Sequence, residues 1–113
     1  MNGIYTVKQV NSYIKNMFTQ DFMLNRIYVK GEISNCKYHP SGHIYFSLKD
    51  ESGTIACVMF AGSRAGLSFT LKNGQRVIAF GSVSVYERDG KYQLYAREIK
   101  LDGAGELLSL IHI

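Results

Sequence analysis

Hydrophobic residues near the start of the chain recur every three or four positions. This spacing places them on one side of an α-helix, which we expect to run over residues 7–19 and to end near Asp21. The preceding stretch Thr6-Val7-Lys8-Gln9 has the form of a capping box. We expect the apolar side to pack on the following element rather than bind a partner, which makes residues 1–24 a helix packed on the rest of the domain. The apolar side consists of Val7, Val10, Ile14, Met17 and Phe18.

From Arg26 onward the period changes to two, because apolar and polar residues alternate as they do in β-strands. Gly31 interrupts the first long run, which indicates a bulge or a sharp bend in that strand. Asp89-Gly90 is a strong signal for a tight hairpin turn. Residues 61–67 form a weak helical segment between the third and fourth strands. The five predicted strands cover residues 26–37, 43–50, 54–60, 75–87 and 91–101.

The order of these elements predicts the fold class. A helix, a three-stranded meander, a short connection and a final hairpin suit a small closed barrel whose strands must coil. We therefore expect a mainly β protein, a five-stranded Greek-key OB-fold barrel over residues 25–102 preceded by an N-terminal α-helix. An SH3-like barrel is the nearest alternative. Residues 103–113 are predicted to be a glycine-rich hinge and the truncated start of a following segment, because they end in a mainly apolar run.

Composition narrows the range of functions. A chain of 113 residues forms one domain with little room for a catalytic cleft, which favours a binding module. The net charge of +4 and the 8 Tyr and 6 Phe favour a polyanionic partner such as nucleic acid. No signal peptide or membrane-length apolar run is visible in the sequence, and only two cysteines are present, so a cytoplasmic location without membrane association is expected.

Candidate binding residues follow from the predicted barrel. An OB-fold binds ligands on the outer face of its second and third strands, where bases stack on rings and cations track phosphates. Tyr45 and Phe60 are predicted to point outward there, although Tyr45 could be an ordinary exposed strand residue and Phe60 could pack under residues 61–67. Further candidates lie in the same strands and in the two flanking loops: Lys30, Lys37, Tyr38, His39, His43, Lys49, Arg64, Arg88, Lys91 and Tyr92.

Catalytic and metal chemistry finds little support. Cys36, His39 and His43 have ligand-like spacing, and Cys57 could join them as a fourth zinc ligand, but the alternation places Cys57 in the core. The sequence has no nucleophile motif and no phosphate-cradling glycine loop. We therefore expect no catalytic residue, no metal and no cofactor in these 113 residues.

Two motifs carry a family resemblance. Val29-Lys30-Gly31-Glu32-Ile33-Ser34-Asn35 and Ser41-Gly42-His43-Ile44-Tyr45-Phe46-Ser47-Leu48-Lys49-Asp50 closely resemble the N-terminal domain of the exodeoxyribonuclease VII large subunit family. Residues 5–11, 57–60, 81–87 and 90–94 fit the same family, so the match spans about residues 5–108.

The resemblance implies an OB-fold that binds single-stranded DNA. It also implies a longer enzyme that hydrolyses such DNA from both ends into acid-soluble oligonucleotides, with a small-subunit partner bound by a downstream region. The family's DNA-binding aromatic at the end of the third strand falls on Phe60, and the following, often basic position is Ala61 here.

A second resemblance keeps other functions open. The stretch from Gly42 to Asp50 is also similar to the anticodon-binding OB domains of aspartate- and lysine-type tRNA synthetases, in which the position of Tyr45 stacks a base. An anticodon-type RNA reader, another module for RNA or single-stranded DNA, and a subunit-interaction module acting through the first helix are therefore alternative hypotheses.

Overall fold

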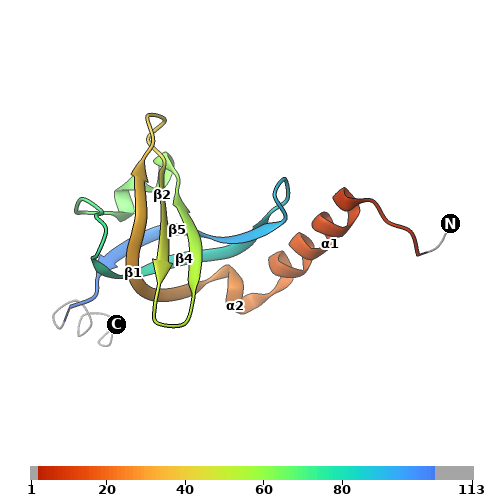
Figure 1. Ribbon diagram of the computed structural model, residues 1–113, viewed down its shortest axis with the longest axis horizontal. Coiled ribbons are helices and arrows are strands. Elements are labelled where there is room, and N and C mark those ends of the chain that lie inside the picture. The colour runs from red at the N-terminus through yellow and green to blue at the C-terminus, as the bar shows by residue number, and fades with distance from the viewer. Residues whose placement is uncertain (1–2, 104–113) are drawn as a thin grey trace.

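The computed structural model describes residues 3–103, and the predicted hinge and following segment lie largely outside that range. Five strands form a barrel, with two helices leading into it and a short 3₁₀ segment, η1, between the third and fourth strands (Figure 1). The predicted strands and the predicted first helix agree with the observed elements to within about two residues. The elements are α1 (Val7–Gln20), α2 (Phe22–Asn25), β1 (Ile27–Tyr38), β2 (Ile44–Lys49), β3 (Thr54–Met59), η1 (Ala61–Gly66), β4 (Arg76–Tyr86) and β5 (Lys91–Leu101).

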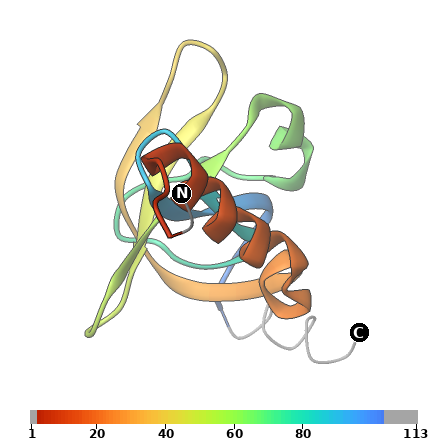
Figure 2. The same ribbon diagram turned by 90° about the vertical axis from the view of Figure 1, so that its right-hand side faces the viewer.

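The strands close into a barrel in the order β1-β2-β3-β5-β4. Neighbouring strands are antiparallel except at the seam between β3 and β5, where Cys57 pairs with Leu94 and Val58 pairs with Tyr95 in parallel. The view in Figure 2 shows the strands curving around a common interior. This order, with a connecting segment before β4, confirms the predicted OB-fold barrel and not the SH3-like alternative.

β1 belongs to both halves of the barrel. Its first half, Ile27 to Glu32, pairs with β4, and from Glu32 onward it pairs with β2. Gly31 lies at this change of partner, where a Cβ atom would sit 3.1 Å from the carbonyl oxygen of Lys49. The bend predicted at Gly31 therefore coincides with the corner, whereas the shift in register lies further along, between Ser34 and Lys37.

The barrel interior is filled by the inward side of every strand. Cys57 is among these residues, as the alternation predicted, and burial raises the pKa of its thiol to about 12. Its sulfur is therefore protonated and unreactive at neutral pH. The core cluster consists of Ile33, Ile44, Phe46, Leu48, Cys57, Met59, Leu71, Val77, Ala79, Val83, Leu94, Ala96 and Ile99.

Two glycines allow backbone segments to approach each other. A Cβ atom on Gly81 would overlap the carbonyl oxygen of Tyr95, and one on Gly66 would overlap the carbonyl oxygen of Arg97. Gly81 also lies beside the shift in register between β4 and β5. Both close approaches are to the backbone of β5. Only glycine at these two positions allows β4 and η1 to lie this near to that strand.

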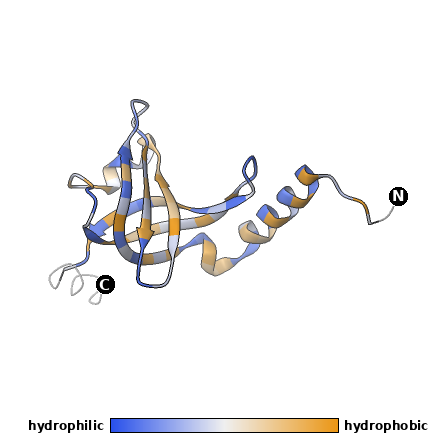
Figure 3. Ribbon diagram, viewed as in Figure 1, coloured by the Kyte–Doolittle hydropathy of each residue, from blue (hydrophilic) through white to orange (hydrophobic). Residues whose placement is uncertain are grey.

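Helix α1 does not pack as the sequence predicted. Phe18 reaches the core cluster, but Val7, Val10 and Met17 are exposed, and Ile14 is more than a third exposed. The apolar segments along the helix are visible in Figure 3. The physical cause is that α1 packs on the barrel by apolar contact only near its C-terminal end, through Phe18. Its first three turns face the barrel with polar side chains, which hydrogen bonds hold there.

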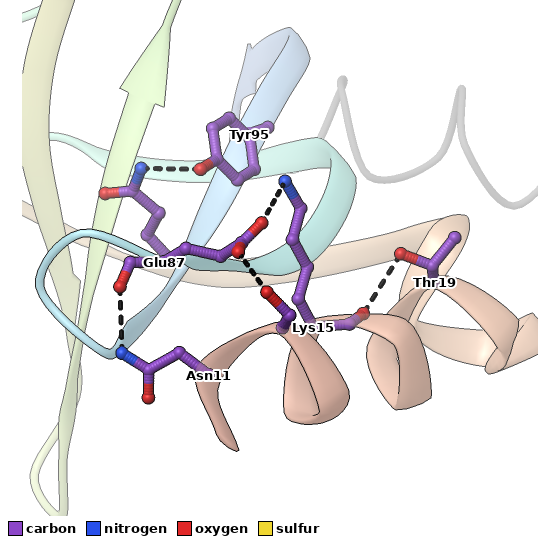
Figure 4. Close-up of polar contacts among 7 residues, drawn as sticks. Asn11, Lys15, Thr19, Glu87 and Tyr95 are labelled. Carbon is purple, nitrogen blue, oxygen red and sulfur yellow. Dashed lines mark hydrogen bonds and ion pairs between the residues drawn. The ribbon is translucent and has the colours of Figure 1, made fainter. Parts of the chain in front are cut away.

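Those hydrogen bonds converge on Glu87, at the start of the β4–β5 turn (Figure 4). The Asn11 side chain donates to the Glu87 carbonyl oxygen at 2.9 Å, and the Ser12 hydroxyl donates to its carboxylate at 2.7 Å. The Lys15 ammonium lies 3.3 Å from the other carboxylate oxygen. The Ser12 hydrogen bond and then Lys15 hold the pKa of Glu87 below its usual value.

Replacing Glu87 by Gln is expected to lower the melting temperature slightly at neutral pH. The carboxylate has a lower pKa in the folded chain than its unfolded value near 4.5, so it stabilises the fold above that pH. The contribution is lost as the pH falls through the folded-state pKa. Circular dichroism melts of wild type and E87Q should therefore converge in strong acid. E51Q removes an exposed carboxylate from the β2–β3 turn and serves as the control; an equal pH-dependent effect there would contradict this role for Glu87.

Candidate nucleic-acid interface

Five rings from four parts of the chain form a continuous line on the barrel surface. The His43 ring meets Tyr45 edge-on at 6.4 Å and Phe60 at 5.2 Å, measured between ring centroids. Phe60 lies 5.7 Å from Tyr95 on β5, and His39 lies 6.1 Å from Tyr45. We call His39, Tyr45, His43, Phe60 and Tyr95 the aromatic row. It crosses β2, the end of β3 and β5, and so it spans the parallel seam of the barrel.

The two predicted stacking residues remain accessible. Tyr45 is 43% exposed and Phe60 is 45% exposed. Val58 lies on β3, between β2 and β5, where it pairs with Tyr45 on one side and Tyr95 on the other. Its side chain is only 1% exposed. A buried residue thus supports the base of the row while the rings above it stay open to solvent. This arrangement is suited to stacking nucleobases, because every base has a π-face.

The hairpin between β1 and β2 is tied to η1 at the centre of the row. The backbone N–H of Ala61 donates to Nδ1 of His43 at 2.9 Å, which leaves the ring's other nitrogen as the donor in its neutral form. Arg64 donates to the carbonyl oxygen of Gly42 at 3.0 Å. Gly42 has φ of 96°, which a residue with a Cβ rarely adopts. These contacts hold His43 in place between Tyr45 and Phe60.

Positive charge adjoins the row at two points. Lys37 is exposed and lies directly across from Tyr45 in the β1–β2 pairing. The guanidinium of Arg64 is 5.4 Å from the ring centre of Tyr38, whose hydroxyl in turn accepts a hydrogen bond from the backbone of Leu71. Lys37 and Arg64 can therefore meet phosphates, whereas Tyr38 positions Arg64 and braces the hairpin.

Other predicted candidates lie away from the row. Lys49 is at the far end of β2 and pairs with Glu32 at 3.7 Å, and Lys30 lies on the part of β1 that pairs with β4. Tyr92 faces α1, with its ring 6.3 Å from Phe18. Arg88 and Lys91 are exposed in and beside the β4–β5 turn, whose position depends on α1 through Glu87.

Tyr95 is a member of the row that the sequence reasoning missed. Its neighbours Leu94 and Ala96 are buried, so alternation alone places Tyr95 on the outside. Its place in the row depends on the parallel pairing of β5 with β3, which brings Tyr95 beside Val58 and Phe60. The sequence pattern does not indicate that pairing. Its hydroxyl accepts a hydrogen bond from the Gln93 side chain at 2.9 Å, which restrains the orientation of the ring.

The cysteine and histidine residues with ligand-like spacing make other contacts. His39 hydrogen-bonds the Ser41 hydroxyl, His43 accepts from Ala61, and Cys57 is in the core. Burial raises the pKa of the Cys36 thiol as well. Within residues 3–103, no three His, Cys, Asp or Glu side chains gather as metal ligands would. Over the same residues, no helix has the length and hydropathy needed to cross a membrane.

Comparison with curated proteins agrees with the resemblance seen in the sequence. The chain is 71% identical over 95% of its length to the exodeoxyribonuclease 7 large subunit of Lachnoclostridium phytofermentans, of which it covers 27%. It is 57% identical over 90% of its length to the protein of the same name from Clostridium botulinum, of which it covers 25%. The chain therefore spans about a quarter of the length of these relatives.

Solved structures share the fold at low sequence identity. An asparaginyl-tRNA synthetase from Pyrococcus horikoshii matches 72% of this chain, and 21% of its own, with a TM-score of 0.56 and 16% identity. A replication protein A heterotrimer bound to single-stranded DNA matches 79% of this chain and 66% of its own, with a TM-score of 0.60 and 10% identity. These similarities concern the barrel architecture alone.

A family model supplies the assignment for the domain itself. The model described as an OB-fold nucleic acid binding domain matches residues 5–100, which takes in α1 and nearly all of the barrel. The observed strand order and the open aromatic row agree with that match. The chain therefore belongs to the OB-fold nucleic-acid-binding domain family.

Proposed function

We propose that this domain binds single-stranded DNA for an exodeoxyribonuclease VII large subunit. The observation that carries the proposal is the row of rings across the barrel seam, in which Tyr45 and Phe60 are exposed and have Lys37 and Arg64 beside them. Stacking requires unpaired bases, because a duplex hides their faces. The high identity to proteins of that name supports DNA as the partner.

The proposed binding mode assigns a role to each side chain. Bases stack on Tyr45 and Phe60, and the backbone runs beside Lys37 and Arg64, which neutralise its phosphates. His43 spaces the two rings and offers its free ring nitrogen to a base edge or phosphate. Lys30, Lys49, Arg88, Lys91 and Tyr92 lie outside this first contact.

In the proposed whole protein, this domain delivers DNA to a catalytic region further along the chain. That region would cut single-stranded DNA into oligonucleotides, and a small subunit would bind to it rather than to the barrel. The enzyme would act in the cytoplasm. The 113 residues themselves are proposed to bind without cutting, since the chain covers only about a quarter of the length of the relatives that bear the enzyme's name.

Fluorescence anisotropy with a labelled oligothymidine of about 5 nucleotides, which spans the aromatic row, tests this function. Binding should weaken with salt with a slope of about −1.4 in log–log form, because two cations each release about 0.7 counterion from a single strand. A duplex of equal length should bind more weakly. Tighter binding to the duplex would contradict the proposal, and base-selective preference for an RNA loop would favour the anticodon-reader alternative.

The Lys37→Gln variant probes the electrostatic part separately. Its salt slope should fall in magnitude by about 0.7 while its preference for single strands persists, because the rings remain. Lys72→Gln removes an exposed lysine from the loop before β4 and is the matched control. If both variants change the slope equally, Lys37 has no specific phosphate contact.

A further inference from the structure

A second group of rings and arginines lies on the outer face of β1, β4 and β5. Tyr28 and Phe80 are cross-strand partners whose ring centres are 4.8 Å apart. The guanidinium carbons of Arg26 and Arg97 each lie 5.5 Å from the centre of the Phe80 ring. We call Arg26, Tyr28, Phe80 and Arg97 the second surface. None of its members belongs to the aromatic row.

Burial does not explain this group. Tyr28 is 62% exposed, and Arg26 and Arg97 are both exposed, so the core gains little from them. Arg97 donates one N–H to the carbonyl oxygen of Asn25 at 3.2 Å, which helps to hold it over the ring. A guanidinium carries five N–H donors, so others stay free to bind phosphate. The second surface therefore presents the exposed Tyr28 ring to solvent, and the two arginines are held nearby over Phe80.

The charge of the surrounding face suits a polyanion. In the next cross-strand row, Lys30 and Lys100 lie on either side of Ile78, and both lysines are exposed. Glu98, which pairs with Phe80, contributes the opposing negative charge. Across these two rows and Arg26 and Arg97, four cations meet one carboxylate, which favours a phosphate backbone there. Beyond Lys30 the face becomes mixed, because that lysine shares a hollow with Glu32 and Asp102 as well as Arg76.

β5 connects the second surface to the aromatic row. Tyr95 contacts Phe60, and Arg97, two residues further along, lies over Phe80. Arg97 is the extra residue where the register shifts, since Ala96 pairs with Gly81 and Glu98 with Phe80. Such a bulge re-aims a side chain. η1 touches β5 at this point through Gly66, and beside that contact lies a hollow of about 520 Å³ whose lining includes Ser63, Phe80, Arg97 and Glu98.

We infer that a DNA single strand leaving the aromatic row past Tyr95 continues onto the second surface. Arg26 and Arg97 bind its phosphates and Tyr28 stacks a further base. This inference rests on the proposed function and extends it, because it assigns a longer binding path that turns around the barrel from the β2–β3 face to the β1–β4 face.

Oligothymidines of two lengths test the longer path. One of about 5 nucleotides reaches only the aromatic row, and one of about 16 reaches both surfaces, within the site sizes known for OB-folds. The double variant Arg26→Gln/Tyr28→Ser should lose about fivefold to tenfold in affinity for the long strand and keep its affinity for the short one. Anisotropy at fixed salt measures both.

The matched control is Lys8→Gln/Tyr13→Ser, which removes one cation and one exposed ring from α1. It should bind both strands as wild type does. Tyr28→Leu keeps a large apolar residue in the strand and should reproduce part of the loss, which separates stacking from any weakening of the fold. Circular dichroism melts verify that each variant is folded.

The outcomes separate this inference from the proposed function. If wild type binds the short strand but gains nothing with length, or if Arg26→Gln/Tyr28→Ser binds both lengths like wild type, the second surface is overturned and the proposed function stands. If wild type binds neither strand, the proposed function itself fails. Equal losses for both lengths would also overturn the longer path, because the short strand cannot reach Tyr28.

Discussion

Replacing Tyr45 and Phe60 together by alanine is expected to lower the affinity for single-stranded DNA about 100-fold. Each ring that stacks a base contributes roughly 1–3 kcal/mol, and two contributions near 1.4 kcal/mol multiply to two factors of ten. Both side chains are more than two-fifths exposed, so their loss removes binding surface rather than core. Anisotropy titrations with labelled oligothymidine give the two dissociation constants directly.

A control pair of exposed rings is available at the N-terminal end, one just before α1 and one on it. Tyr5 and Tyr13 are exposed and lie outside the aromatic row, so their double alanine variant should bind DNA as wild type does. Tyr45→Leu/Phe60→Leu preserves cover over Val58 and should still bind weakly. If the alanine double variant retains wild-type affinity while its melt is unchanged, the aromatic row is not the binding site.

The second large effect concerns stability. Gly81→Ala is expected to lower the free energy of unfolding by about 3 kcal/mol, because overpacking against backbone cannot be relieved by rotating a side chain. The added Cβ would overlap the carbonyl oxygen of Tyr95, so β4 and β5 must move apart. Urea unfolding followed by circular dichroism measures the change.

Gly62→Ala is the matched control for that measurement. No heavy atom outside its immediate surroundings lies within 4 Å of a Cβ built there, so the same chemical change should be near neutral. A loss of similar size at both positions would mean that general glycine effects, rather than the contact with Tyr95, dominate. G81A should also weaken DNA binding, since Tyr95 belongs to the aromatic row.

The strands and their inward sides could be predicted from the sequence because alternation is a local property. The packing of α1 could not, since the usual rule assumes that the apolar side is buried. Here Asn11 and Ser12 hydrogen-bond to Glu87, which is 75 or more positions away in the sequence. A local sequence pattern does not predict a hydrogen bond over that distance. The first half of the helix is consequently attached through polar side chains, and only Phe18 makes the expected apolar contact with the core.

The candidate site likewise combines features that local sequence predicts with contacts between distant residues that it does not. Tyr45 and Phe60 followed from strand phase and resemblance, but their grouping with Tyr95 depends on a parallel pairing between β3 and β5. Likewise, Lys30 and Lys49 appeared close to Tyr45 in sequence, yet the coiling of β1 carries Lys30 to the β4 side. The sequence therefore predicted where each residue lies along its strand. Which residues become neighbours around the barrel depends on how the strands pair when the barrel closes.

The way in which β1 is shared between the two halves has a consequence for how the chain acquires its structure. Its first half can find its partner only when Arg76–Tyr86 is present, about fifty residues later, and the seam needs Lys91–Leu101 as well. Contacts so distant in sequence slow folding, because the long loop between them must be ordered first. During synthesis the β1–β2–β3 meander therefore emerges from the ribosome with both edges unpaired, and the barrel closes only after β5 has been released.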